Sequence, residues 1–219
     1  MHSASTPVPP VATSDRAALV ARGLRLEYLT IAWNGFEAAV ALIAGIVAGS
    51  VALVGFGLDS VIETVSAVIL LWRLRSDSET SRREHSEHVA RRLVGACFVL
   101  LAAYITAESA HALWTHERAQ RSLAGILIAI AAVLVMPLLG RAKRRVAVEL
   151  GSRALHSDSR QADFCAYLSA ILLAGLVLNT LFGWWWADPA AALIMVPIMA
   201  REGVRGLRGE VCDDCGGAH

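Results

Sequence analysis

The chain has 219 residues, of which 56% are hydrophobic, and its formal net charge at pH 7 is +1. Soluble domains are about half apolar and lack repeated long apolar runs, so this composition excludes an ordinary soluble domain. A charge so close to zero gives no reason to expect a nucleic-acid partner, and we predict none.

Residues 1–22 form the first segment, and they begin with a stretch rich in Pro, Ser, Thr and Ala. This composition is typical of a disordered arm, and the arm lacks the basic start and apolar stretch of a signal peptide. Beyond it we predict an all-α, polytopic transmembrane domain over residues 23–205. Its six apolar runs are long enough to cross a bilayer as helices. The predicted spans are 28–48, 51–72, 93–114, 123–139, 157–182 and 184–200.

Basic residues are distributed unequally between the two sides of these spans. Only Arg118 and Arg121 lie on one side, and Arg160 lies within the fifth span. The other 17 of the 20 Lys and Arg residues precede the first span or follow the second, fourth and sixth. Because cytoplasmic loops contain the excess of Lys and Arg, we predict that both termini are cytoplasmic. An even number of spans agrees with this orientation.

Two acids lie one helical turn apart in the second span. Asp59 and Glu63 are its only charged residues, and their i, i+4 spacing places both side chains on one face. A carboxylate at membrane depth is costly and usually marks an ion or proton pathway. The pair therefore indicates a cation carrier. Glu37 in the first span is a third acid, for which an accessory role in the ion path and a helix-packing role are equally open.

The fifth span begins with a second polar segment that has two candidate faces. One face contains residues at i, i+3 and i+7: Asp158, Gln161 and Cys165. The other contains His156, Arg160 and Asp163. Either face is a candidate lining for a cation cavity. Arg160 and Asp163 are also a candidate ion pair, because charges within membranes commonly pair.

The last span and the tail contain weaker signals. Trp184 to Trp186 are typical of an interfacial aromatic belt, and Asp188 before Pro189 is typical of a helix start, so we predict a structural role for Asp188. Residues 206–219 form a short cytoplasmic tail with a single Cys212-x-x-Cys215. Transient binding of a soft cation and a frayed tail both remain open for that motif.

The order of these motifs over about residues 20–205 resembles the cation diffusion facilitator family. In that family, the second and fifth spans each supply two metal ligands, usually in a His/Asp-xxx-Asp motif. Asp59-Ser-Val-Ile-Glu63 is similar to the first motif, with Glu in the last place. In the fifth span, Asp158 matches the acid that precedes the motif, while the His and Asp places fall on Gln161 and Cys165. We expect the family's cytoplasmic dimer-forming domain to be lacking, because too few residues follow residue 205.

This resemblance implies a multi-pass membrane protein, in the cell membrane if prokaryotic, that exports a divalent cation by alternating access with proton exchange. Protons and metal compete because a ligand must be deprotonated to bind. Zinc accepts N, S and O ligands, whereas an all-oxygen site would suit manganese or magnesium, so the metal stays open with zinc foremost. The implied site residues are Asp59, Glu63, Asp158, Gln161 and Cys165, with Asp163, His156 and Glu37 as accessory candidates. The metal is the substrate, no cofactor is permanently bound, and the expected partners are the cation, protons, the bilayer and a second copy in a homodimer.

Two other function classes remain as alternatives. The sequence Gly55-Phe-Gly-Leu-Asp59 resembles the Gly-x-Gly-Asp motif of intramembrane aspartyl proteases, but it has an extra residue, and no Tyr-Asp motif supplies the partner acid. We therefore expect that the protein is not an enzyme. A non-transporting membrane metal sensor or chaperone is the second alternative, because the fifth-span motif is incomplete. Uptake of metal by vesicles separates transport from sensing.

Overall fold

The computed structural model describes residues 13–75, 80–151 and 153–208, and these residues contain six helices and no strand. The helices are α1 (Thr13–Ala48), α2 (Val51–Arg75), α3 (Thr80–Thr115), α4 (Leu123–Leu150), α5 (Arg153–Phe182) and α6 (Ala187–Arg208). The predicted all-α class with six helices is confirmed. Among the described residues, α1 to α5 are long and apolar enough to cross a membrane. The second half of α6 contains Arg201, Glu202 and Arg205, which lower its hydropathy.

Every helix extends beyond its predicted span at one end or both, and two of these extensions, in α1 and α4, bear on the site. The structure corrects the predicted disordered arm for residues 13–22, which already belong to α1, while residues 1–12 lie outside the described residues. The segment TSDRAALVAR contains neither Pro nor Gly and is rich in good helix formers. At its far end, α4 continues eleven residues past the predicted limit and ends only at Gly151, whose left-handed backbone (φ 61°) caps the helix. Lys143, which we expected in a loop, therefore lies within α4.

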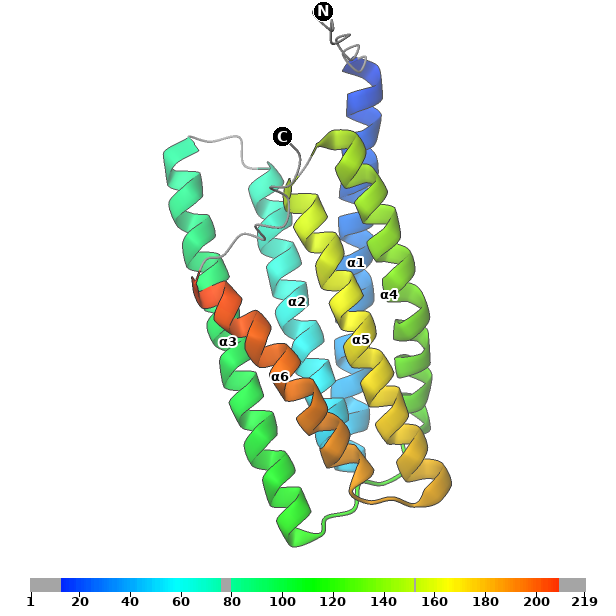
Figure 1. Cartoon of the computed structure of the whole chain (residues 1–219). Coiled ribbons are helices and arrows are strands. Elements are labelled where there is room, and N and C mark those ends of the chain that lie inside the picture. Colours follow the sequence, from blue (N-terminus) through cyan, green and yellow to red (C-terminus); the bar gives the residue numbers. More distant parts are fainter. Residues whose placement is uncertain (1–12, 76–79, 152, 209–219) are drawn as a thin grey trace, which may run out of the picture.

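The six helices form one bundle with α2 at its centre (Figure 1). Figure 1 shows α3 and α6 side by side along one flank, and α1, α4 and α5 on the other side of α2. Helix α2 packs against α1, α3, α5 and α6, so its middle is enclosed. Phe56, Asp59 and Ser60 on α2 are completely buried. The two acids of α2 thus lie in the interior of the bundle.

Asp188 connects the start of α6 to the start of α2. Its carboxylate accepts hydrogen bonds from the Ser50 hydroxyl and from the backbone N–H groups of Val51 (2.9 Å) and Ala52 (3.4 Å). The first N–H groups of a helix have no partner within the helix, and an acid there also interacts favourably with the helix dipole. Asp188 therefore has a structural role of the kind predicted, although it caps α2 rather than its own helix.

The helix directions lead to a testable topology. The end of α2 and the start of α3 lie at the same end of the bundle as the start of α1, as do the end of α4 and the start of α5, whereas the α3–α4 connection lies at the opposite end (Figure 1). With the basic residues concentrated at the first end, we expect a cysteine at position 86 to react only from the cytoplasm and one at position 120 only from outside. A membrane-impermeant maleimide on intact cells measures this, in a background from which the native cysteines have been removed. Labelling of position 86 from outside would overturn the orientation.

Candidate metal centre

Three potential metal ligands meet at the middle of α2. Asp59 and Glu63 of α2 and Cys165 of α5 each offer one ligand atom, and these atoms all lie within 4.8 Å of one another. All three residues are buried. Carboxylate oxygen and thiolate sulfur are both established zinc ligands. The helical period brings Asp59 and Glu63 to one face, and packing of α5 against α2 brings Cys165 to them.

Asp59 has the most unusual environment of the three. Both of its carboxylate oxygens are buried, and neither has a hydrogen-bond partner among the described residues. Glu37 and Glu202 of α6 lie close enough to repel a negative charge on Asp59. Buried polar groups are nearly always hydrogen-bonded, so an unpartnered acid surrounded by other acids indicates a place for a positively charged species.

Two amide side chains orient Glu63. The Asn34 side chain donates to Oε2 of Glu63 (2.9 Å), and the Gln161 side chain donates to Oε1 (3.1 Å). Gln161 thus lies beside the cluster, in contact with one of its acids. Asn34 on α1 was not recognised from the sequence, because an isolated Asn in an apolar span resembles any helix-packing residue. Second-sphere hydrogen bonds of this kind fix the direction in which a ligand presents its free lone pairs.

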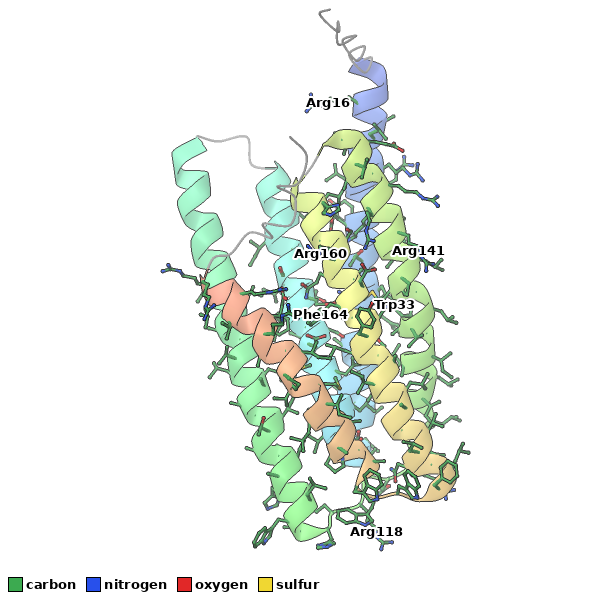
Figure 2. All side chains as sticks on the ribbon, viewed as in Figure 1. Arg16, Trp33, Arg118, Arg141, Arg160 and Phe164 are labelled. Carbon is green, nitrogen blue, oxygen red and sulfur yellow. The ribbon has the colours of Figure 1, made fainter. Side chains whose placement is uncertain are left out.

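Glu37 links three helices at the same level. Its Oε1 accepts from the Ser60 hydroxyl (2.7 Å) and from the Cys165 thiol (3.7 Å), and its Oε2 accepts from the Trp33 indole (2.8 Å). Trp33 lies near the middle of the bundle in Figure 2. The acid therefore packs α1 against α2 and α5, and it also contacts a candidate ligand directly. Both roles left open by the sequence are compatible with this position.

Asp158 lies on the same face of α5 as Gln161 but has a cationic partner. The ammonium group of Lys143 on α4 contacts Oδ2 of Asp158 and Oε2 of Glu27 on α1, the latter at 3.2 Å. Lys143 and Glu27 are both buried. Neither residue was predicted from the sequence, because hydropathy places the end of the fourth span before Lys143 and the start of the first span after Glu27. One feature of the sequence distinguishes Lys143 in advance: it is the only lysine among the 20 Lys and Arg residues.

The other face of α5 does not join the cluster. Asp163 pairs with Arg144 of α4, and both side chains are about two-fifths exposed (38% and 42%). Of the two open readings for this face, the candidate pair between Arg160 and Asp163 is not formed, because α4 continues far enough to place Arg144 beside Asp163. Arg160 is exposed, and Figure 2 shows it toward the same end of the bundle as Arg141, opposite Arg118. His156 is not among the clustered ligand groups of the described chain. The Cys212 and Cys215 pair lies outside the described residues.

A small cavity connects the centre with the ion pair. Its volume is about 20 Å³, enough for one water molecule or ion. Residues from both groups line it, among them Asn34, Glu63, Gln161, Lys143 and Asp158. A species bound there contacts the acid of α2 on one side and the Lys143–Asp158 pair on the other.

Residues 28–211 match the family of the cation efflux transmembrane domain, a match that includes the whole centre just described. The chain belongs to the cation efflux family. The resemblance of its motifs to cation diffusion facilitators is thereby confirmed, and with five apolar helices the chain is a multi-pass membrane protein. The centre thus lies on the two helices that resemble the family's metal-binding spans.

Two curated relatives have similar sequences. An uncharacterized transporter of Synechocystis sp., sll1263, is 27% identical over 153 residues, which cover 67% of this chain and 49% of that protein. Transmembrane protein 163 of Xenopus laevis is 26% identical over 187 residues, which cover 84% of this chain and 66% of that protein. The chain thus spans about half the length of the first relative and 66% of the second.

Proposed function

We propose that this cation efflux family member transports a divalent cation, foremost zinc, and that Asp59, Glu63 and Cys165 are ligands of the transported ion. One observation carries the proposal. Three buried ligand atoms from two helices lie within 4.8 Å of one another, and Asp59 has no hydrogen-bond partner among the residues described. Membership of a transporter family supports movement of the ion over static binding.

The chemistry of the donor atoms favours zinc over the harder cations. Manganese and magnesium prefer carboxylate, carbonyl and water oxygens, whereas a thiolate selects softer metals. Zinc usually takes four ligands in a tetrahedron. Asp59, Glu63 and Cys165 supply three, and the fourth place falls to the amide oxygen of Gln161 or to a water molecule in the adjoining cavity.

The same residues support exchange of metal for protons. A thiol must lose its proton to bind zinc, and a carboxylic acid must be ionised. The Cys165 thiol already donates to Glu37, so this acid is placed to accept the thiol proton when zinc binds and to release it to the side from which zinc entered. A proton taken up from the opposite side would restore the thiol when zinc leaves. Alternating access of the centre to the two ends of the bundle would then move zinc one way and protons the other. We retain a homodimer as the expected assembly.

Flux measurements in proteoliposomes test this function. Purified protein should transport Zn²⁺ and Cd²⁺ faster than Mn²⁺, Co²⁺ or Fe²⁺, with proton movement in the opposite direction. Cys165→Ser should lower zinc flux about tenfold relative to manganese flux, because a hydroxyl replaces the soft sulfur ligand. Cys97→Ser is the matched control, since Cys97 is an exposed residue of α3.

Three outcomes would contradict the proposal. Absence of flux for every metal would overturn transport, and zinc binding without flux would instead favour the sensor alternative. An unchanged metal preference in Cys165→Ser would remove the thiol from the ligand set.

A further inference from the structure

Lys143 is unusual in both its chemistry and its position. It is the only lysine among the 20 Lys and Arg residues of the chain, and it is only 1% exposed within α4. Lysine presents a compact point charge at the end of a flexible stem, whereas arginine presents a wide planar fork. A buried position between three helices therefore accommodates an ammonium group more readily than a guanidinium group.

Two acids from different helices converge on this ammonium group. Glu27 of α1 and Asp158 of α5 both contact Nζ of Lys143, and Glu27 is completely buried. The second oxygen of Glu27 is also buried and has no hydrogen-bond partner in the described part of the chain. Two converging carboxylates with an unpartnered buried oxygen are a donor set typical of a cation site, and here the ammonium group of Lys143 occupies that site.

This ion cluster lies between the metal centre and one end of the bundle. Lys143 and Asp158 line the same cavity as Glu63 and Gln161. Asp158 lies nearer the start of α5 than Gln161 and Cys165 do. Figure 1 shows that the start of α5 lies at the same end of the bundle as the end of α4. Asp158 shares a helix face with both residues, one turn from Gln161 and two turns from Cys165, and its partner there is Lys143 rather than a residue of the metal centre.

We propose that Lys143 is a tethered cation that holds Asp158 apart from the metal centre and closes the cavity toward the α4–α5 connection. A divalent ion that moves between the centre and that end displaces the ammonium group from Asp158, and the ammonium group returns once the ion has passed. Lys143 is thus a positioning residue for transport. This inference rests on the proposed function, because it needs an ion at Asp59 and Glu63.

Zinc binding to the full chain in lipid nanodiscs tests the inference, with stoichiometry and affinity measured by titration with zinc alone. Lys143→Gln should bind one more zinc ion than the wild type, because Glu27 and Asp158 are then left without their cation. Lys143→Arg, which keeps the charge although its wide fork fits the position less well, should bind no additional ion. Arg144→Gln is the matched control, since it removes the next cation along α4 from a half-exposed pair.

A double variant tests whether the additional zinc ion of Lys143→Gln binds at Asp158. Lys143→Gln combined with Asp158→Asn should return to the wild-type stoichiometry. If Lys143→Gln binds no additional ion and keeps the wild-type affinity, the inference is overturned.

Asp158→Asn alone covers the case in which Lys143→Gln fails to fold. It should keep the wild-type stoichiometry and lose no more than about 10–100-fold in affinity, because Asp158 is then a supporting residue rather than a ligand. Complete loss of zinc from Asp158→Asn would make Asp158 a ligand and overturn the inference. A wild-type protein that binds no zinc would instead refute the proposed function, so the two failures are distinguishable.

Discussion

Asp59→Ala abolishes metal transport and leaves the protein folded in the membrane: this is the largest effect that we expect. Loss of a direct ligand should lower flux by more than the roughly 10–100-fold typical of second-sphere residues. Stability should be kept, because neither oxygen of Asp59 makes a hydrogen bond within the described residues. Removal of a buried charge also makes α2 more apolar, which favours insertion.

Flux of zinc into proteoliposomes, normalised to the amount of inserted protein, measures this effect. Asp163→Asn is the matched control, because Asp163 is an acid that is partly exposed and paired with Arg144 outside the centre. It should keep most of the wild-type flux. Wild-type flux in Asp59→Ala would refute the centre, and loss of flux in Asp163→Asn alone would move the site to the other face of α5.

Asp188→Ala should be the most destabilising single substitution of those considered, with a loss of about 2–4 kcal/mol. The carboxylate satisfies the Ser50 hydroxyl and the N–H groups of Val51 and Ala52, and Asp188 is 1% exposed. Removing one partner of a buried hydrogen bond leaves the other unsatisfied, at about 1–3 kcal/mol for each group. Relaxation of the turn offsets part of the sum, and Ser50 still caps α2 by accepting from the N–H of Leu53 (3.1 Å).

Thermal unfolding in detergent or lipid measures this loss. Asp188→Asn is the graded control, because its amide oxygen can accept some of these bonds but has no negative charge for the start of α2. It should unfold between the wild type and Asp188→Ala. If Asp188→Ala unfolds at the wild-type temperature but loses zinc, the residue has an ion role and the structural assignment is wrong.

The metal centre shows which contacts the period of a single helix predicts and which contacts it does not predict. The 3.6-residue period alone places Asp59 with Glu63, and Gln161 with Cys165, on shared faces, because both pairs lie within continuous helices. The same helical period places Asp163 and Cys165 on different faces of α5. Period and spacing do not say which side chain on another helix each face meets. They group Asp158 with Gln161 and Cys165 on one face of α5, but they do not reveal that Lys143 of α4 contacts Asp158.

Helix limits near the bilayer surface were the least predictable feature. Hydropathy ends the fourth span at residue 139, where the basic segment begins. The helix continues to Leu150 because the following residues still favour it and Gly151 supplies the cap. The eleven additional residues contain Lys143 and Arg144, the cationic partners of Asp158 and Asp163. An error in one helix limit therefore concealed both ion pairs.

The sequence by itself determined that this is an all-α membrane protein with six helices, that its acids at Asp59 and Glu63 share one face, and that its motifs resemble those of cation carriers. These features follow from composition and from the period of a single helix. Only the tertiary structure decided that Cys165 meets those acids, that Asn34 and Gln161 orient Glu63, and that Glu27 and Asp158 surround Lys143. Each of these contacts joins residues of different helices, and how the helices pack, not the spacing along any one of them, determines which side chains meet.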